Sequence, residues 1–176
     1  MRKLLVCLAL AALCASCNPS EPAEDLAATP TGAPAEGIQQ CQDRTPAPPD
    51  KADKMSSKKP DIEIPEGAPP CDLVIQDIVE GDGAKAKEGD SLQVHYVGVS
   101  WSTGEEFDSN WTKGSPIELS LMQVIPGWQQ GIPGMKEGGQ RQLIIPPDLA
   151  YGDNPPSAAI KPGETLVFII GLVKAG

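Results

Sequence analysis

The segment "QVIPGWQQGIPGM", residues 123–135, constrains the fold more than any other part of the chain. Two prolines and three glycines fall within these thirteen residues, so the segment suits neither a long helix nor a strand. Its apolar residues nevertheless recur at a mostly helical spacing, and they include the large aromatic side chain of Trp128. The pattern predicts one brief helix over residues 124–132, which must be held by tertiary packing because so short a helix is marginal alone.

The segments around this helix are typical of short strands. In "SLQVHYVGVS", residues 91–100, the side chains of Leu92, Val94 and Tyr96 share one face, and the residues between them share the other. Comparable segments with turn signals between them predict further strands at residues 72–81, 105–109, 117–121, 140–146 and 164–173. The sequence therefore predicts a domain of about five short strands and one short helix, with residues 61–70 as a candidate additional edge strand.

The N-terminus, "MRKLLVCLALAALCASC", is typical of an export signal. Arg2 and Lys3 precede an apolar run over residues 4–15, which is shorter than the ~20 residues that a membrane-spanning helix needs. We therefore expect residues 1–16 to be a signal peptide; a buried core helix is the alternative. Cys17 follows small residues as in a bacterial lipobox, although Cys14 stands where that motif usually has Leu. Cys17 is expected to be lipidated and to anchor an extracytoplasmic protein to the cell membrane, the alternative being cleavage without lipid.

Residues 17–60 are expected to form a disordered, proline-rich tether after the lipidated cysteine, followed by a globular domain over residues 61–176. Eleven of the nineteen prolines lie between residues 18 and 70, and large apolar residues are few there. Cys41 and Cys71 remain as an even pair in an oxidising compartment, where they can form a disulfide. Two cysteines and the single His95 do not make a metal site, and no cofactor is expected. The net charge of −10 argues against a nucleic-acid partner.

Aromatic residues are scarce, with two Phe, two Tyr and three Trp in the chain. Five of these seven fall in segments that can converge, which is a first indication of a pocket: Tyr96, Phe107, Trp128, Tyr151 and Phe168.

Five sequence blocks in register resemble the FK506-binding-protein type of peptidyl-prolyl cis-trans isomerase. They are "VHYVG" (94–98), "EFDS" (106–109), "VIPGWQQGIPGM" (124–135), "PPDLAYG" (146–152) and "ETLVFIIGLV" (164–173). Their order and approximate spacing extend the resemblance over roughly residues 72–174. The resemblance implies an α+β fold in which an antiparallel, curled sheet wraps around one short helix. It also implies that this helix serves to present Trp128 as the floor of a pocket.

The resemblance implies a site for each position that matches the family's pocket. The catalytic residues would be Tyr96, Phe107, Asp108, Trp128, Tyr151 and Phe168, and the substrate-binding residues Ile117, Val124, Ile125 and Ile160. Four rings would enclose a prolyl ring, the N–H of Ile125 and the hydroxyl of Tyr151 would hold substrate carbonyls, and Asp108 would accept from Tyr96. The chain departs from the family at Ile117, where many members have Phe, and in a segment about two residues shorter before Val124.

Isomerisation of an Xaa-Pro bond breaks no covalent bond, because its barrier is the loss of amide resonance, about 18–20 kcal/mol. A dry aromatic pocket can favour the twisted, less polar amide without a nucleophile or a metal. The expected substrates are unfolded or proline-containing exported polypeptides, and FK506-like macrolides are candidate ligands. The alternative is a binding or chaperone module on the same fold with weak catalysis. The aromatic residues can also be read as core filling, and Asp108 as a turn-capping residue.

Overall fold

A computed structural model describes residues 41–176, apart from residues 48, 52 and 53. The expected signal peptide over residues 1–16 and the expected lipid on Cys17 therefore lie outside the described residues. The part described here contains six strands and one α-helix, which confirms the expected α+β class and gives one strand more than the approximate count.

The six strands form one antiparallel sheet in the order β1-β5-β6-β2-β3, and β4 pairs with the same edge of β2 as β3 does. Their bounds are Val74–Val79 (β1), Ser91–Ser100 (β2), Glu106–Ser109 (β3), Ile117–Ser120 (β4), Gln140–Ile145 (β5) and Leu166–Ala175 (β6). Short 3-10 helices lie at Trp111–Lys113 (η1), Leu121–Gln123 (η2) and Pro147–Leu149 (η3), and the α-helix α1 spans Pro126–Gly131. The long strands β2 and β6 pair along almost their whole length and form the centre of the sheet.

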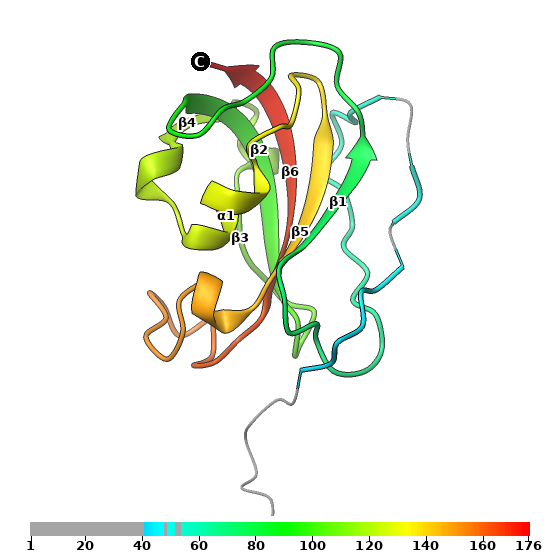
Figure 1. The fold of residues 1–176 in the computed structure, drawn as a ribbon, viewed down its shortest axis with the longest axis vertical. Coiled ribbons are helices and arrows are strands. Elements are labelled where there is room, and N and C mark those ends of the chain that lie inside the picture. The colour runs from blue at the N-terminus through cyan, green and yellow to red at the C-terminus, as the bar shows by residue number, and fades with distance from the viewer. Residues whose placement is uncertain (1–40, 48, 52–53) are drawn as a thin grey trace, which may run out of the picture. The chain divides into compact units, whose positions relative to one another are not determined.

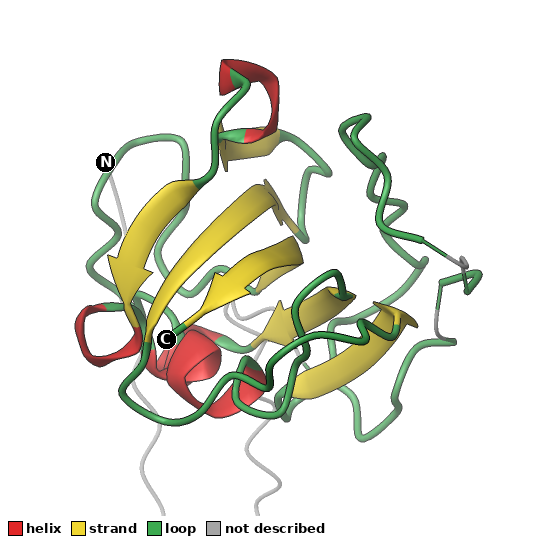
Figure 2. Cartoon of the chain, turned by 90° about the horizontal axis from the view of Figure 1, so that it is seen from above, coloured by secondary structure: helices red, strands yellow, loops and turns green. Residues whose placement is uncertain are grey.

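Helix α1 packs on one face of the sheet, as Figures 1 and 2 show. Pro126 stands at the start of the helix, where its missing N–H would have no intrahelical partner anyway. Gly127 and Gly131 lie four residues apart and therefore on one side of α1. A Cβ atom at Gly127 would lie 2.4 Å from Ile145 Cγ2, and one at Gly131 would lie 2.7 Å from Leu143 Cδ2. The glycines that interrupt the helical pattern thus allow the helix backbone to approach β5 closely.

The main core lies between α1 and the sheet and contains fourteen buried residues. Leu92 and Val94 of β2, both with no exposed surface, pack there together with the half-buried Tyr96. Val97, on the other face of β2, belongs to a separate cluster on the opposite side of the sheet. The alternation predicted for residues 91–100 is confirmed by this division.

The opposite face of the sheet is covered by residues 41–70, which we call the strap. Figure 1 shows the strap and α1 on opposite sides of the sheet. Ile62 and Ile64 pack against a buried cluster that includes Trp101, and the indole Nε1 of Trp101 donates to Gly67 O at 3.2 Å. Residues 61–70 contribute no strand, and they join the domain through the packing of Ile62 and Ile64 and the hydrogen bond from Trp101 to Gly67.

The strap is fastened to the domain at several points along its length. Gln76 Nε2 of β1 donates to Pro46 O at 2.8 Å, and Lys59 Nζ forms an ion pair with Glu106 of β3 at 2.8 Å. Cys41 and Cys71 form a disulfide with a Cα–Cα distance of 4.8 Å. Contacts with the domain therefore begin well before Asp61, while most of the described residues from 41 to 60 remain exposed.

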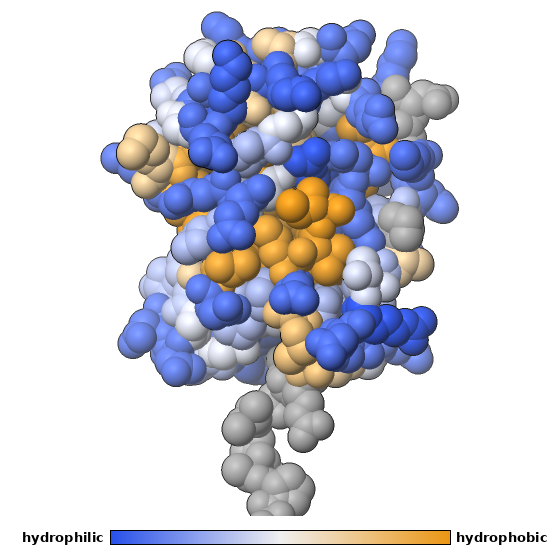
Figure 3. Space-filling view, in the orientation of Figure 1, coloured by the Kyte–Doolittle hydropathy of each residue, from blue (hydrophilic) through white to orange (hydrophobic). Residues whose placement is uncertain are grey.

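The face of the molecule drawn in Figure 3 is mainly hydrophilic, in keeping with the net charge of −10. Figure 3 shows one group of apolar side chains near the centre of the face seen in Figure 1, surrounded by hydrophilic residues. Within residues 41–176, leaving aside the three undescribed positions, no helix is long and apolar enough to cross a membrane.

Candidate active site

A cavity of about 340 Å³ opens between α1, β3, β4 and the segment that follows η3. Its volume is near the lower end of the range typical of small-molecule sites, roughly 300–1,000 Å³. The lining is mostly aromatic and aliphatic, and it is formed by Tyr96, Phe107, Asp108, Ile117, Leu119, Gln123, Val124, Ile125, Trp128, Tyr151 and Phe168. The structure therefore brings nine of the ten sequence-predicted pocket residues to one cavity.

Trp128 of α1 and Phe168 of β6 are the buried aromatic residues of this lining, with exposed fractions of 5% and 4%. Their rings are 5.2 Å apart and nearly perpendicular, and the ring of Tyr96 meets Trp128 edge-on at 5.6 Å. Phe107 meets Phe168 in the same way at 5.5 Å. Edge-to-face pairs at these distances are favourable, so the four rings support one another in a fixed arrangement around an apolar space.

The polar groups of the cavity gather around Asp108. The hydroxyl of Tyr96 donates to Asp108 Oδ2 at 2.5 Å. Burial of the Tyr96 ring raises the pKa of its hydroxyl above the ordinary value, and the hydrogen bond to Asp108 and its negative charge act in the same direction. Burial also raises the pKa of Tyr151, with a smaller effect of the Asp108 charge. Both phenols are therefore neutral hydrogen-bond donors at neutral pH.

Two further residues of the lining stand at the ends of short helices and carry hydrogen-bond donors. Ile125 precedes α1, and among the described residues its N–H donates to no backbone or side-chain acceptor. Tyr151 follows η3, where the N–H groups of Ala150 and Gly152 both donate to Pro147 O at 3.1 and 2.8 Å. These bonds fold the chain tightly after β5, which places the half-buried Tyr151 ring in the lining.

The structure also shows where the sequence-based list was incomplete. Leu119 and Gln123 line the cavity but were not predicted; both lie in the shortened segment before Val124, where the family pattern gave no matching position. Ile160 was predicted at the rim but belongs to the main core, where 4% of its surface is exposed, and it is absent from the lining. Ile160 was assigned to the site by its match to the family's pocket, and a role of this residue in substrate binding stays a prediction.

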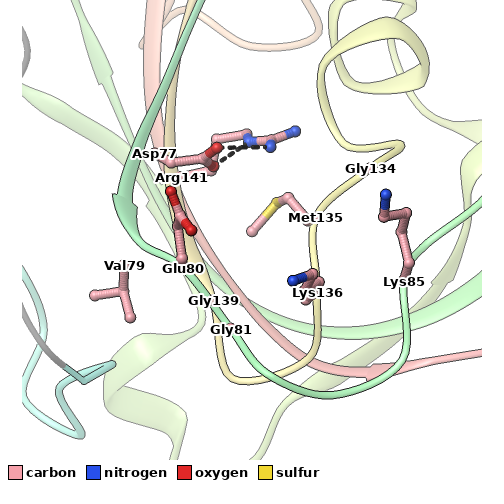
Figure 4. A pocket seen from close by; sticks show the side chains of 10 residues that line it. All are labelled: Asp77, Val79, Glu80, Gly81, Lys85, Gly134, Met135, Lys136, Gly139 and Arg141. Carbon is pink, nitrogen blue, oxygen red and sulfur yellow. Dashed lines mark hydrogen bonds and ion pairs between the residues drawn. The ribbon is translucent and has the colours of Figure 1, made fainter.

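A second depression, drawn in Figure 4, lies beyond the C-terminal end of α1 and differs in character. Its lining carries several charged side chains, and Arg141 forms two hydrogen bonds with Asp77, at 2.6 and 3.0 Å. The same guanidinium donates to Gly131 O at 2.7 Å. Because the last carbonyls of a helix need such donors, Arg141 fastens the end of α1 to β5 and β1.

No group of three or more His, Cys, Asp or Glu side chains that could hold a metal ion is found in the described part of the chain. The lining of the aromatic cavity is that of an apolar binding site with a few hydrogen-bond donors and one carboxylate.

Comparisons with known proteins agree with this geometry. The family model of the FKBP-type peptidyl-prolyl cis-trans isomerases matches residues 82–173. The chain is 55% identical over 122 residues to an FK506-binding protein of Streptomyces anulatus, an alignment that covers 68% of this chain and 98% of the relative. It is 54% identical over 118 residues to a probable FK506-binding protein of Corynebacterium glutamicum, covering 67% of this chain and 99% of the relative.

Solved structures give the same answer for the fold. The crystal structure of FkpA from Escherichia coli matches with a TM-score of 0.54 and 36% identity, over 68% of this chain and 53% of that one. The crystal structure of AtFKBP13 matches with a TM-score of 0.52 and 38% identity, over 59% of this chain and 93% of that one. Sequence, fold and cavity lead to one family: the chain belongs to the FKBP-type peptidyl-prolyl cis-trans isomerases, enzymes that interconvert the cis and trans forms of Xaa-Pro bonds.

Proposed function

We propose that the aromatic cavity binds the prolyl ring of a substrate and lowers the barrier to rotation about the preceding amide bond. The observation that carries this proposal is the set of four mutually supporting rings with Trp128 as the buried floor. A proline side chain is small and apolar, and it fits a cavity of about 340 Å³ with part of the flanking backbone.

The polar groups have distinct roles in this proposal. The N–H of Ile125, which has no acceptor among the described residues, holds one substrate carbonyl, and the neutral hydroxyl of Tyr151 donates to another. Asp108 holds the Tyr96 hydroxyl and places a negative charge near the rotating amide. Ile117, Leu119 and Val124 supply the apolar rim.

The rate enhancement follows from the loss of water around the amide. A planar amide is more polar than a twisted one, because its resonance places charge on the oxygen. Transfer from water to the cavity therefore disfavours the planar ground state more than the twisted transition state. Fixed hydrogen bonds to the flanking carbonyls hold the chain on both sides of the bond that turns.

We further propose that the enzyme acts on unfolded, proline-containing polypeptides after export, and that a lipid on Cys17 anchors it to the cell membrane. The basic start, the short apolar run and the small residues before Cys17 support this placement. The aromatic cavity also supports binding of FK506-like macrolides, although the exposed Ile117, in place of the usual Phe, changes one wall. Mass spectrometry of the N-terminus from native membranes tests the anchor, because an unmodified cysteine would refute it.

The function is tested by cis-to-trans isomerisation of short peptides that contain Leu-Pro or Phe-Pro, with and without an FK506-like macrolide. We expect acceleration that the macrolide abolishes. Trp128→Ala and Asp108→Ala should each lower kcat/KM by about tenfold or more. Gln142→Ala is the matched control, because Gln142 is a buried polar residue on the strap side of the sheet. A folded protein without any acceleration would favour the binding-module alternative.

A further inference from the structure

Asn110 occupies an unusual place in the sheet, in a gap between two strands that pair with the same edge of β2. β4 pairs with residues Ser91 to Val94 of β2, and β3 pairs with residues Val97 to Val99. Between these two ladders, the edge of β2 at Tyr96 faces no strand among the described residues. Tyr96, which carries a pocket ring, therefore lies where regular pairing is interrupted.

The side chain of Asn110 supplies the missing hydrogen bonds. Its Oδ1 accepts from the Tyr96 N–H at 2.7 Å, and its Nδ2 donates to Val94 O at 2.9 Å. A neighbouring strand would offer one carbonyl and one N–H at these places, and the amide of Asn offers the same pair of groups. The backbone N–H of Asn110 adds a bond to Tyr96 O at 3.1 Å.

The position of Asn110 in the chain connects this gap with the second polar residue of the cavity. Asn110 follows β3 directly and stands two residues after Asp108. The Tyr96 hydroxyl reaches back to Asp108 at 2.5 Å. The backbone of β2, the Asn110 amide, the end of β3 and the Tyr96–Asp108 hydrogen bond thus form a closed loop of contacts.

Burial makes this arrangement sensitive to the identity of residue 110. Asn110 is 1% exposed, so loss of its amide would leave the buried Tyr96 N–H and Val94 C=O without partners. Asp has no donor for Val94 O, and Ser is too short to supply both bonds. Only an amide of this length provides an acceptor and a donor from one side chain at this place.

We propose that Asn110 is a positioning residue of the isomerase, which holds the Tyr96 ring and the Asp108 carboxylate in register across the gap between β3 and β4. It acts through these two residues and does not itself line the cavity. The inference rests on the proposed roles of Tyr96 and Asp108, and it names the element that keeps them together.

The test compares Asn110→Ala, Asn110→Ser, Tyr96→Phe and the buried control Gln142→Ala, with two measurements on each purified protein. The first is kcat/KM for a Leu-Pro peptide. The second is native-state hydrogen exchange of the Tyr96 amide relative to the Val97 amide, which reports local opening separately from global stability. If Asn110→Ala does not fold, Asn110→Ser is used in its place to test the role of the Asn110 amide.

For Asn110→Ala we expect a loss of about tenfold or more in kcat/KM, since small displacements of positioned groups have effects of this size. Exchange of the Tyr96 amide should rise by at least about tenfold relative to Val97, with Asn110→Ser between this variant and wild type. Gln142→Ala should change neither kcat/KM nor the exchange rate of the Tyr96 amide relative to that of the Val97 amide. If Tyr96→Phe keeps full activity, the proposed role of the phenol fails and the inference fails with it. If Tyr96→Phe loses activity while both Asn110 variants match Gln142→Ala, only the inference is overturned.

Discussion

Gly98 offers the sharpest single test of the cavity, because its missing side chain leaves room for two of the pocket rings. Gly98 lies in β2, opposite Asp108 of β3 and Phe168 of β6. A Cβ atom at this position would lie 2.6 Å from Phe107 Cζ and 2.6 Å from Phe168 Cε1. Ordinary van der Waals contacts are 3.4–4 Å. In Gly98→Ala, both rings must therefore move away from the new Cβ by about 0.8 Å, unless the backbone of β2 shifts.

The ring that moves farther should be that of Phe107. Phe168 is 4% exposed on a central strand, whereas Phe107 is half-buried on β3, a four-residue strand at the edge of the sheet. Overpacking typically destabilises by about 1–3 kcal/mol, and replacing a strand glycine by alanine recovers about 0.5–1 kcal/mol. We expect a net loss of about 0–2.5 kcal/mol in the free energy of unfolding. A displaced cavity wall should lower kcat/KM by about 10- to 100-fold.

Urea denaturation and the peptide isomerisation assay measure the two effects separately. Gly171→Ala is the matched control: its Cβ would lie 2.6 Å from Met55 Sδ of the strap and 3.1 Å from Trp111, on the face of the sheet away from the cavity. This variant should lose stability and keep its kcat/KM. Equal activities for the Gly98 and Gly171 variants would refute the claim that the Phe107–Phe168 pair forms a wall of the active site.

Three further predictions concern the rest of the domain. Replacing Cys41 and Cys71 by serine opens a link of sequence separation 30, and should lower the free energy of unfolding by about 3.5 kcal/mol in urea denaturation; an unchanged midpoint would contradict this. The chain has two tyrosines, both with raised pKa values, so phenolate absorbance should appear at a higher pH in the folded than in the unfolded protein. Because the unfolded phenols of Tyr96 and Tyr151 release protons first, stability should fall as pH rises above ~10. Arg141→Met should lower the free energy of unfolding by about 1–3 kcal/mol, because it leaves the buried carbonyl of Gly131 unpaired and removes the ion pair with the partly exposed Asp77, and a denaturation midpoint equal to wild type would refute this.

Much of the fold could be predicted because the strands carry clear alternation. In β2, side chains at even-numbered positions from Leu92 to Tyr96 pack in the main core, as the pattern indicates. The helix was predicted over residues 124–132 and spans Pro126–Gly131. The reason for its glycines could not be read from the sequence, because the close approach of α1 to Leu143 and Ile145 is a property of the packed structure.

The strap is the part of the domain that composition described least well. Its prolines and small residues are typical of disordered segments. A prediction from composition is dominated by these residues and gives little weight to the few apolar residues that anchor the strap. Ile62 and Ile64, which were expected within the domain, cover two clusters on the far face of the sheet, and Met55 of the expected tether lies beside Gly171 of β6. Isolated apolar residues of this kind have no periodicity, so their docking depends on a surface that distant strands build.

Residues in the candidate site were predictable to different degrees, for a physical reason. Trp128 and Phe168 are held by the core, and their sequence context is strongly patterned. Leu119 and Gln123 line the cavity from β4 and η2. The segment that contains them is shorter than the corresponding segment of the family pattern. The positions of Leu119 and Gln123 depend on the length of the segment before Val124 and could not be predicted from the two side chains themselves.

The cavity has a rigid floor and a more mobile outer wall, so different substrates should be accommodated by movement of the outer wall. Its floor belongs to the interior, since Trp128 and Phe168 are almost fully buried and pack against each other. Its outer wall belongs to β3, whose register with β2 shifts between Gly98 and Val99 and which Asn110 fastens at its end. Since edge elements open more easily than central strands, substrate-dependent adjustment should be confined to β3, while the prolyl ring always meets the same floor.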